Sequence, residues 1–209
     1  MDRICVVTSK AKAYYAIVSM MKKVDIPFTS AVPGGESRDC VLIITSAGEV
    51  GQFGGRALAL EAMDENPGVF KGQLLSKLDG GRDVMLVGVD PGKRIGLAVF
   101  YGETNLEFST FGSIFRLSLR IGAFVRGVPA RMSLIRVGNG NLAGAAKLIE
   151  SLKLEAPRAV VELVDESGTS VRLARMKGLQ GDQGAAARIA FRKGEVVSSG
   201  GPRTHAQGF

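Results

Sequence analysis

The sequence predicts an α/β protein in which a mixed sheet flanked by helices is preceded by a small α/β domain. The first observation is the unbroken apolar run Val84–Val89, which ends at Asp90 and is typical of a strand buried on both faces. The second is the order of elements after it, where three strands precede alternating helices and strands. The third is the strand and helix alternation of residues 2–50.

Residues 81–194 are expected to form the larger domain. Its predicted elements are strands 84–91, 95–102 and 105–112, helix 113–126, strand 132–137, helix 141–153, strand 158–165 and helix 182–193. The Pro91-Gly92 turn makes the first two strands a hairpin, because proline fixes one backbone dihedral and glycine permits the left-handed one. Residues 195–209 contain Ser-Ser and Gly-Gly pairs, and we expect a flexible tail.

Residues 1–80 are expected to form the small domain, with a boundary near residue 80. Strands are predicted at 4–8, 26–29 and 40–46, and helices at 10–24 and 56–63; the segment from about 65 to 81 is predicted to be a connector. Cys5 and Cys40 each lie in a predicted buried strand, so we expect reduced core residues and not a disulfide. No P-loop or dinucleotide motif occurs here, and these residues do not indicate a role.

The residue composition limits which kinds of catalytic or metal-binding site the chain can form. The 209 residues include one histidine, His205, which argues against a histidine-based zinc site and a Ser-His-Asp triad. Carboxylates are then the metal ligands to expect, and they favour Mg²⁺ or Mn²⁺. No apolar run is long enough to cross a bilayer and no signal peptide is evident, so we expect a cytoplasmic protein without a membrane partner.

The net charge of +7 lies entirely in the second part of the chain. Residues 1–80 hold 9 Lys and Arg against 9 Asp and Glu, whereas residues 81–209 hold 18 against 11. No acidic residue occurs from Phe108 to Ile149. Such asymmetry points to a polyanionic partner, although a basic surface helix is the plain alternative. The candidates for phosphate contacts are Lys93, Arg94, Arg116, Arg120 and Arg136.

Acidic residues end two predicted strands and begin one predicted helix. Asp90 ends the apolar run, Asp165 and Glu166 end strand 158–165, and Asp182 precedes an alanine-rich helix. A carboxylate at the tip of a buried strand is costly unless its charge is used, although capping a turn would also explain Asp90. If the two strands are parallel neighbours, their tips lie side by side, where ligands gather in open α/β sheets.

The motifs around these acids resemble a known group. Asp90-Pro91-Gly92 with Arg94-Ile95-Gly96-Leu97-Ala98, then Asp165-Glu166-Ser167-Gly168-Thr169-Ser170, then Asp182-Gln183-Gly184-Ala185-Ala186 resemble the ribonuclease H-like superfamily. The resemblance is to the YqgF and RuvC group of Holliday-junction resolvase-like nucleases, over about residues 83–194. One departure is Ser167, where YqgF proteins usually carry an arginine.

The resemblance implies a ribonuclease H-like fold and a divalent-metal-dependent endonuclease. Asp90, Glu166 and Asp182 would hold Mg²⁺ or Mn²⁺, and Asp165 would ligate directly or orient Glu166. Glu162 is judged from the alternation of strand 158–165, which leaves a fourth ligand or a solvent-facing side chain, and we favour solvent. The expected partner is Holliday-junction or other branched DNA, or structured RNA, with a homodimer left open. The alternative is a catalytically inactive nucleic-acid-binding protein with the same fold.

Overall fold

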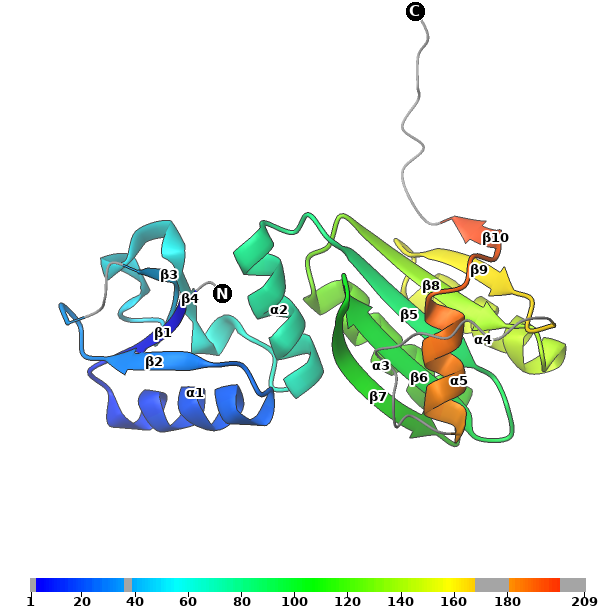
Figure 1. The fold of residues 1–209 in the computed structure, drawn as a ribbon, viewed down its shortest axis with the longest axis horizontal. Helices are drawn as coiled ribbons and strands as arrows, with labels where there is room; N and C mark the ends of the chain where they lie inside the picture. Colours follow the sequence, from blue (N-terminus) through cyan, green and yellow to red (C-terminus); the bar gives the residue numbers. More distant parts are fainter. Residues whose placement is uncertain (1–2, 36–38, 168–180, 200–209) are drawn as a thin grey trace, which may run out of the picture. The chain divides into compact units, whose positions relative to one another are not determined.

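The computed structural model describes residues 3–35, 39–167 and 181–199. The chain divides into two compact units, Met1–Gly81 and Arg82–Phe209. Both units combine sheets with flanking helices, which confirms the predicted α/β class (Figure 1). No helix in the described part of the chain is long and apolar enough to span a membrane.

The N-terminal unit is built on a parallel sheet. Its strands are β1 (Arg3–Val7), β2 (Phe28–Ala31), β3 (Cys40–Thr45) and β4 (Ala57–Ala59), in the order β2-β1-β3-β4. Successive residues of a strand point to opposite faces, so β1 contributes to two apolar layers. Ile4 and Val6 share a core with Ile17 of α1 (Ala11–Lys23), whereas Cys5 and Val7 pack with residues that include Phe53.

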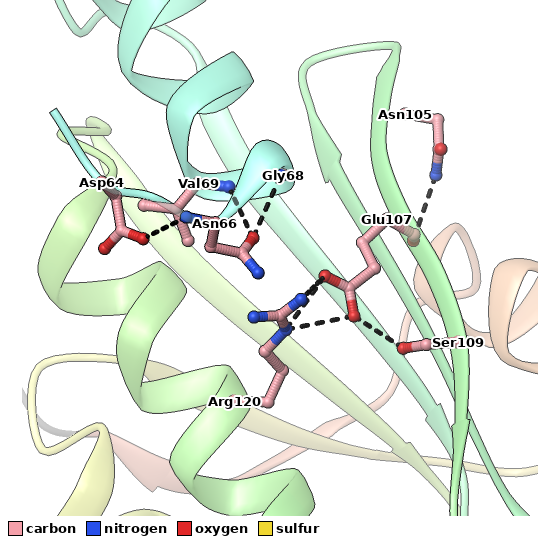
Figure 2. Close-up of polar contacts among 8 residues, drawn as sticks. All are labelled: Asp64, Asn66, Gly68, Val69, Asn105, Glu107, Ser109 and Arg120. Carbon is pink, nitrogen blue, oxygen red and sulfur yellow. Dashed lines mark hydrogen bonds and ion pairs between the residues drawn. The ribbon is translucent and has the colours of Figure 1, made fainter. Parts of the chain in front are cut away.

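Two predictions for this unit are wrong. Residues 56–63 do not form the predicted α-helix. Arg56 is the last residue of a 3-10 turn, the strand β4 follows, and Leu60–Ala62 form another 3-10 turn. The predicted connector is instead α2 (Pro67–Asp79), whose cap is drawn in Figure 2. The Asn66 side chain accepts hydrogen bonds from the backbone N–H groups of Gly68 (3.0 Å) and Val69 (3.1 Å). Proline is well tolerated at the first helical position, so Pro67 begins this helix where we expected a break.

The two cysteines also differ from the prediction. Cys5 of β1 and Cys40 of β3 form a disulfide, with 5.8 Å between their Cα atoms. Since β1 and β3 are hydrogen-bonded neighbours, their backbones hold the two residues at a separation that a disulfide can bridge. Burial was predicted correctly, but the adjacency of the strands could not be inferred from their 35-residue separation in sequence.

The C-terminal unit contains one six-stranded mixed sheet, in the order β10-β9-β8-β5-β6-β7. Strands β5 (Val84–Asp90), β6 (Ile95–Tyr101) and β7 (Thr104–Phe111) form an antiparallel meander. Strands β8 (Met132–Gly138) and β9 (Val160–Val164) continue the sheet parallel to β5. The last strand, β10 (Glu195–Ser199), pairs antiparallel with β9, so the predicted flexible tail is wrong for these five residues.

Three helices in the described part of this unit flank the sheet. Figure 1 shows α5 (Gly181–Ala190) in front of the sheet, with α3 (Ile114–Gly127) and α4 (Leu142–Glu155) behind it. The alanines of α5 pack on Ala98 and Phe100 of β6. Glycine permits this close packing, because a Cβ atom added at Gly88 of β5 would lie 2.0 Å from the carbonyl oxygen of Ala186. The helix that carries Asp182 is therefore held tightly against the strand that ends at Asp90.

Candidate active site at the ends of the parallel strands

The ends of three parallel strands bring the predicted site residues to one edge of the sheet. Asp90 ends β5, and Asp165 and Glu166 follow β9 directly. Strand β8 lies between β5 and β9, so the two acid-bearing strands are not the neighbours that we considered. Neighbouring strands are about 4.8 Å apart, which separates the axes of β5 and β9 by about 10 Å. Long side chains must span that gap if the acids are to act together.

Glu166 reaches back over the end of β8. Its Oε1 accepts a hydrogen bond from the backbone N–H of Gly140 (2.9 Å), and its own N–H donates to Oδ1 of Asn139 (3.0 Å). A Cβ atom added at Gly138 would lie 2.2 Å from the same Oε1, so only glycine leaves room for the carboxylate there. Sequence analysis missed this turn, residues 138–141, although two Gly-Asn pairs directly after an apolar strand are a strong turn signal.

Asp182 reaches the same region from α5. A Cβ atom added at Gly96 of β6 would lie 2.0 Å from the carbonyl oxygen of Asp182, so the helix starts in close contact with the hairpin. The Nε atom of Arg94 lies 3.9 Å from Oδ2 of Asp182, and both side chains are open to solvent. Arg94, a predicted phosphate contact, therefore lies beside Asp182, a predicted metal ligand.

The acids influence one another electrostatically. Burial raises the pKa of Asp90, and repulsion from the charges of Glu166 and Asp182 raises it further. The backbone N–H of Gly92 and the positive charge of Arg188 act in the opposite direction. Among the described residues, however, no group of three or more Asp, Glu, His or Cys side chains is arranged to hold a metal ion. A metal shared by these three acids stays a prediction.

Asp165 is engaged in its own turn. It accepts hydrogen bonds from the backbone N–H (2.9 Å) and hydroxyl (2.6 Å) of Ser167, and from Nδ2 of Asn139 (3.3 Å). The bonds from Ser167 are the main reason that the pKa of Asp165 is lowered. Since Asn139 also binds the backbone of Glu166, Asp165 supports the loop that positions Glu166. The rest of this motif, including Thr169 and Ser170, lies outside the described residues.

Glu162 and Arg136 form a buried pair, which corrects two predictions. Oε2 of Glu162 lies 2.8 Å from Nε of Arg136, and the side chains are only 10% and 13% exposed. Nη1 of Arg136 also donates to the carbonyl of Ala190 (2.7 Å), and the N–H of Gly194 donates to Glu162 (3.1 Å). Glu162 therefore does not point to solvent, and Arg136 is turned into the protein and away from any phosphate. The pair joins two neighbouring strands to the end of α5.

Arg120 is likewise occupied within the fold. Figure 2 shows its guanidinium against the carboxylate of Glu107 on β7, with Nη2 2.7 Å from Oε2 and Nε 3.1 Å from Oε1. Ser109 donates a further hydrogen bond to the same carboxylate, and the guanidinium lies 5.6 Å from the ring centroid of Phe124. Arg116, one helical turn earlier, is exposed. Although both were candidates for phosphate contacts, Arg116 and Arg120 therefore do not form a common phosphate-binding face.

Basic residues other than Arg120 and Arg136 lie beside the acids. Lys93 and Arg94 are exposed in the turn between β5 and β6. Arg188 is exposed on α5 and its charge acts on Asp90, while Nη1 of Arg192 donates to the carbonyl of Asp165 (2.6 Å). Sequence analysis missed Arg188 and Arg192, although they stand four residues apart in the predicted helix 182–193, a spacing that puts two side chains on one face of a helix. In the structure α5 ends at Ala190, so Arg192 lies just beyond it.

A second polar centre, in the N-terminal unit, was also missed. The buried Glu49 carboxylate accepts hydrogen bonds from the hydroxyls of Thr8, Ser9 (2.6 Å), Thr45 (3.2 Å) and Ser46 (2.7 Å) and from the N–H of Ser9 (2.8 Å). These bonds, led by the Ser9 hydroxyl, hold the pKa of Glu49 far below its usual value. The carboxylate joins the loops after β1 and β3, and its bonding is explained by that structural role.

No protein-family model, curated protein or solved structure matches this chain. The function is therefore inferred from the chemistry of the site itself.

Proposed function

We propose that the C-terminal unit is a ribonuclease H-like nuclease that hydrolyses phosphodiester bonds in structured nucleic acid with Mg²⁺ or Mn²⁺. The observation that carries the proposal is that the ends of three separate elements place Asp90, Glu166 and Asp182 at one edge of the sheet, where the charges of Glu166 and Asp182 act on Asp90. Holliday junctions and other branched DNA are the first substrates to test. The strand order supports the fold assignment, since a three-stranded meander followed by two parallel strands and a closing helix is the arrangement that the resemblance implies.

The donor set fits a hard divalent cation. All three proposed ligands are carboxylates, which suit Mg²⁺ or Mn²⁺, and a cation among them would relieve the repulsion that raises the pKa of Asp90. When bound, such a metal supplies an activated water and stabilises charge on the leaving oxygen. Gly140 and Arg94 now contact Glu166 and Asp182, so metal binding would share or replace those contacts.

The chain's own residues would position the substrate. Arg94 and Lys93 extend from the turn after β5, and Arg188 extends from α5, so cationic groups lie on two elements beside the acids. Phosphate groups attract such side chains, and the guanidinium fork binds two phosphate oxygens at once. Asn139 and Gly140 keep Glu166 folded over the end of β8. The nucleic-acid backbone would therefore be held directly over Asp90.

The second candidate is a nucleic-acid-binding protein without catalysis. Two observations favour it: Ser167 stands where the similar group usually has an arginine, and the described acids are not arranged around a common metal position. Both candidates require nucleic-acid binding by the same cationic groups. Only cleavage and metal binding distinguish them.

The deciding experiment is a cleavage assay over labelled four-way junctions, branched and linear DNA, and structured RNA, with Mn²⁺ or Mg²⁺. We expect cleavage by the native chain and none by Asp90→Asn, which keeps the size of the side chain and removes its charge. Glu150→Gln on the exposed side of α4 is the matched control and should cleave normally. Metal-dependent binding without cleavage would favour the second candidate, and full activity in excess chelator would overturn the metal mechanism.

A further inference from the structure

The outer face of α1, in the N-terminal unit, combines lysines with an exposed aromatic ring. The helix buries Ile17 and Met21 on one side. Tyr15 lies on the other side and is 79% exposed. Lys12 precedes Tyr15 by three residues and Lys22 follows it by seven, so all three lie along one face of the helix. Both lysines are exposed.

Only part of the charge on α1 serves the stability of the helix: Lys22 and Lys23 lie in its last turn, where the macrodipole favours positive charge. Residues 10–24 contain four lysines and no acidic residue, in a unit whose first 80 residues carry no net charge. Lys10 and Lys12 stand at the helix N-terminus, where the macrodipole disfavours positive charge, and no side chain caps that end. A helix selected for stability alone would place acidic residues there. The two lysines at the N-terminal end, Lys10 and Lys12, therefore point to a negatively charged partner.

The tyrosines provide a second and independent feature. The hydroxyl of Tyr14 donates to Oγ of Ser30 on β2 (3.1 Å), which ties that side chain to the sheet. Among the described residues, no hydrogen bond engages the hydroxyl of Tyr15. Large aromatic rings this exposed are commonly contact residues, because a flat apolar face gains from stacking on another ring.

We propose that the Lys12–Tyr15–Lys22 face of α1 binds single-stranded nucleic acid, with a base stacked on Tyr15 and phosphates at the two lysines. An aromatic platform beside positive charge is the arrangement that binds single strands without sequence preference. Duplex bases are already stacked on each other and leave no free face for the ring. The surface lies outside the proposed nuclease unit, and this binding does not depend on cleavage.

The intrinsic fluorescence of the protein tests the proposal. The chain has three tyrosines and no tryptophan, and the third tyrosine, Tyr101, is 4% exposed. A short oligothymidylate or oligouridylate, titrated into the full chain in chelator, should quench the fluorescence of the tyrosines on α1. Tyr15→Ala should weaken the binding that Tyr14 reports by about 5-fold to about 100-fold, whereas Tyr15→Phe should keep it.

The lysines are tested through salt dependence. The slope of log affinity against log salt should flatten by roughly 0.7 for each lysine lost, so Lys12→Ala with Lys22→Ala should change it by about 1.4. Lys77→Ala on α2 and Phe115→Ala on α3, where Phe115 is 65% exposed, are matched controls and should leave the quenching unchanged.

Several results would overturn the proposal. Absence of quenching, equal affinity of Tyr15→Ala, or equally tight binding of a blunt duplex would exclude a stacked single strand. Equal competition by polyglutamate would show a purely ionic surface, and binding only to anionic vesicles would show a membrane contact. Because the chelator prevents metal-dependent cleavage, each of these outcomes can be interpreted even if the proposed nuclease activity is absent.

Discussion

Replacing Arg136 by alanine should destabilise the C-terminal unit and leave phosphate binding unchanged. The variant leaves the Glu162 carboxylate with the N–H of Gly194 and removes the donor that binds the Ala190 carbonyl at 2.7 Å. Removing one partner of a buried ion pair costs about 3–5 kcal/mol, because the remaining charge is buried without compensation. With both side chains nearly buried, we expect a loss of about 4 kcal/mol in the free energy of unfolding.

Urea denaturation measures this loss. In a Tyr14→Phe, Tyr15→Phe background, Tyr101 of β6 is the remaining tyrosine and reports on the C-terminal unit alone. The midpoint should fall without a change in the m value. Lys153→Ala, which breaks an exposed pair with Glu150 on α4, should cost less than about 1 kcal/mol.

A loss below about 1 kcal/mol for Arg136→Ala would refute the buried-pair interpretation. So would a salt dependence of nucleic-acid binding that flattens by about 0.9, which is the effect of losing one duplex phosphate contact. The double variant Arg136→Met, Glu162→Leu should be markedly more stable than Arg136→Ala, because it leaves no unpaired charge in the protein.

Three further predictions concern stability. Burial, together with repulsion from Glu166 and Asp182, raises the pKa of Asp90, so its ionisation above about pH 4 opposes folding. Asp90→Asn should therefore raise the Tm at neutral pH in chelator, and a lower Tm would contradict the raised pKa. Reducing Cys5–Cys40 should cost the N-terminal unit about 4 kcal/mol for its 35-residue separation, measured by denaturation with and without a thiol reductant. Glu49→Ala should cost about 2 kcal/mol at neutral pH. Since the pKa of Glu49 is lowered, that difference should shrink as the pH falls below about 4, and a pH-independent difference would refute the role of its charge.

Local pattern was enough to predict most elements of the C-terminal unit. Apolar runs such as Val84–Val89 and the turn residues between them produce strands whatever their neighbours are, so β5 to β9 lie within two residues of their predicted bounds. The position of Asp90 at a strand end and of Asp182 at a helix start follow from the same patterns. Misjudging Pro67 as a break was a local error, since Asn66 and Pro67 together were a readable helix start.

The tertiary structure decided which residues far apart in the sequence contact one another. In the C-terminal unit β8 lies between β5 and β9, and Glu166 therefore contacts the backbone N–H of Gly140. In the N-terminal unit the pairing of β1 with β3 places Cys5 next to Cys40. Strand order also set Arg136 opposite Glu162 in register, which turned an expected surface arginine and an expected solvent-facing acid into a buried pair. The physical reason is that the sequence specifies which faces are apolar, whereas the partner of a buried charge depends on which strands become neighbours when those faces pack together.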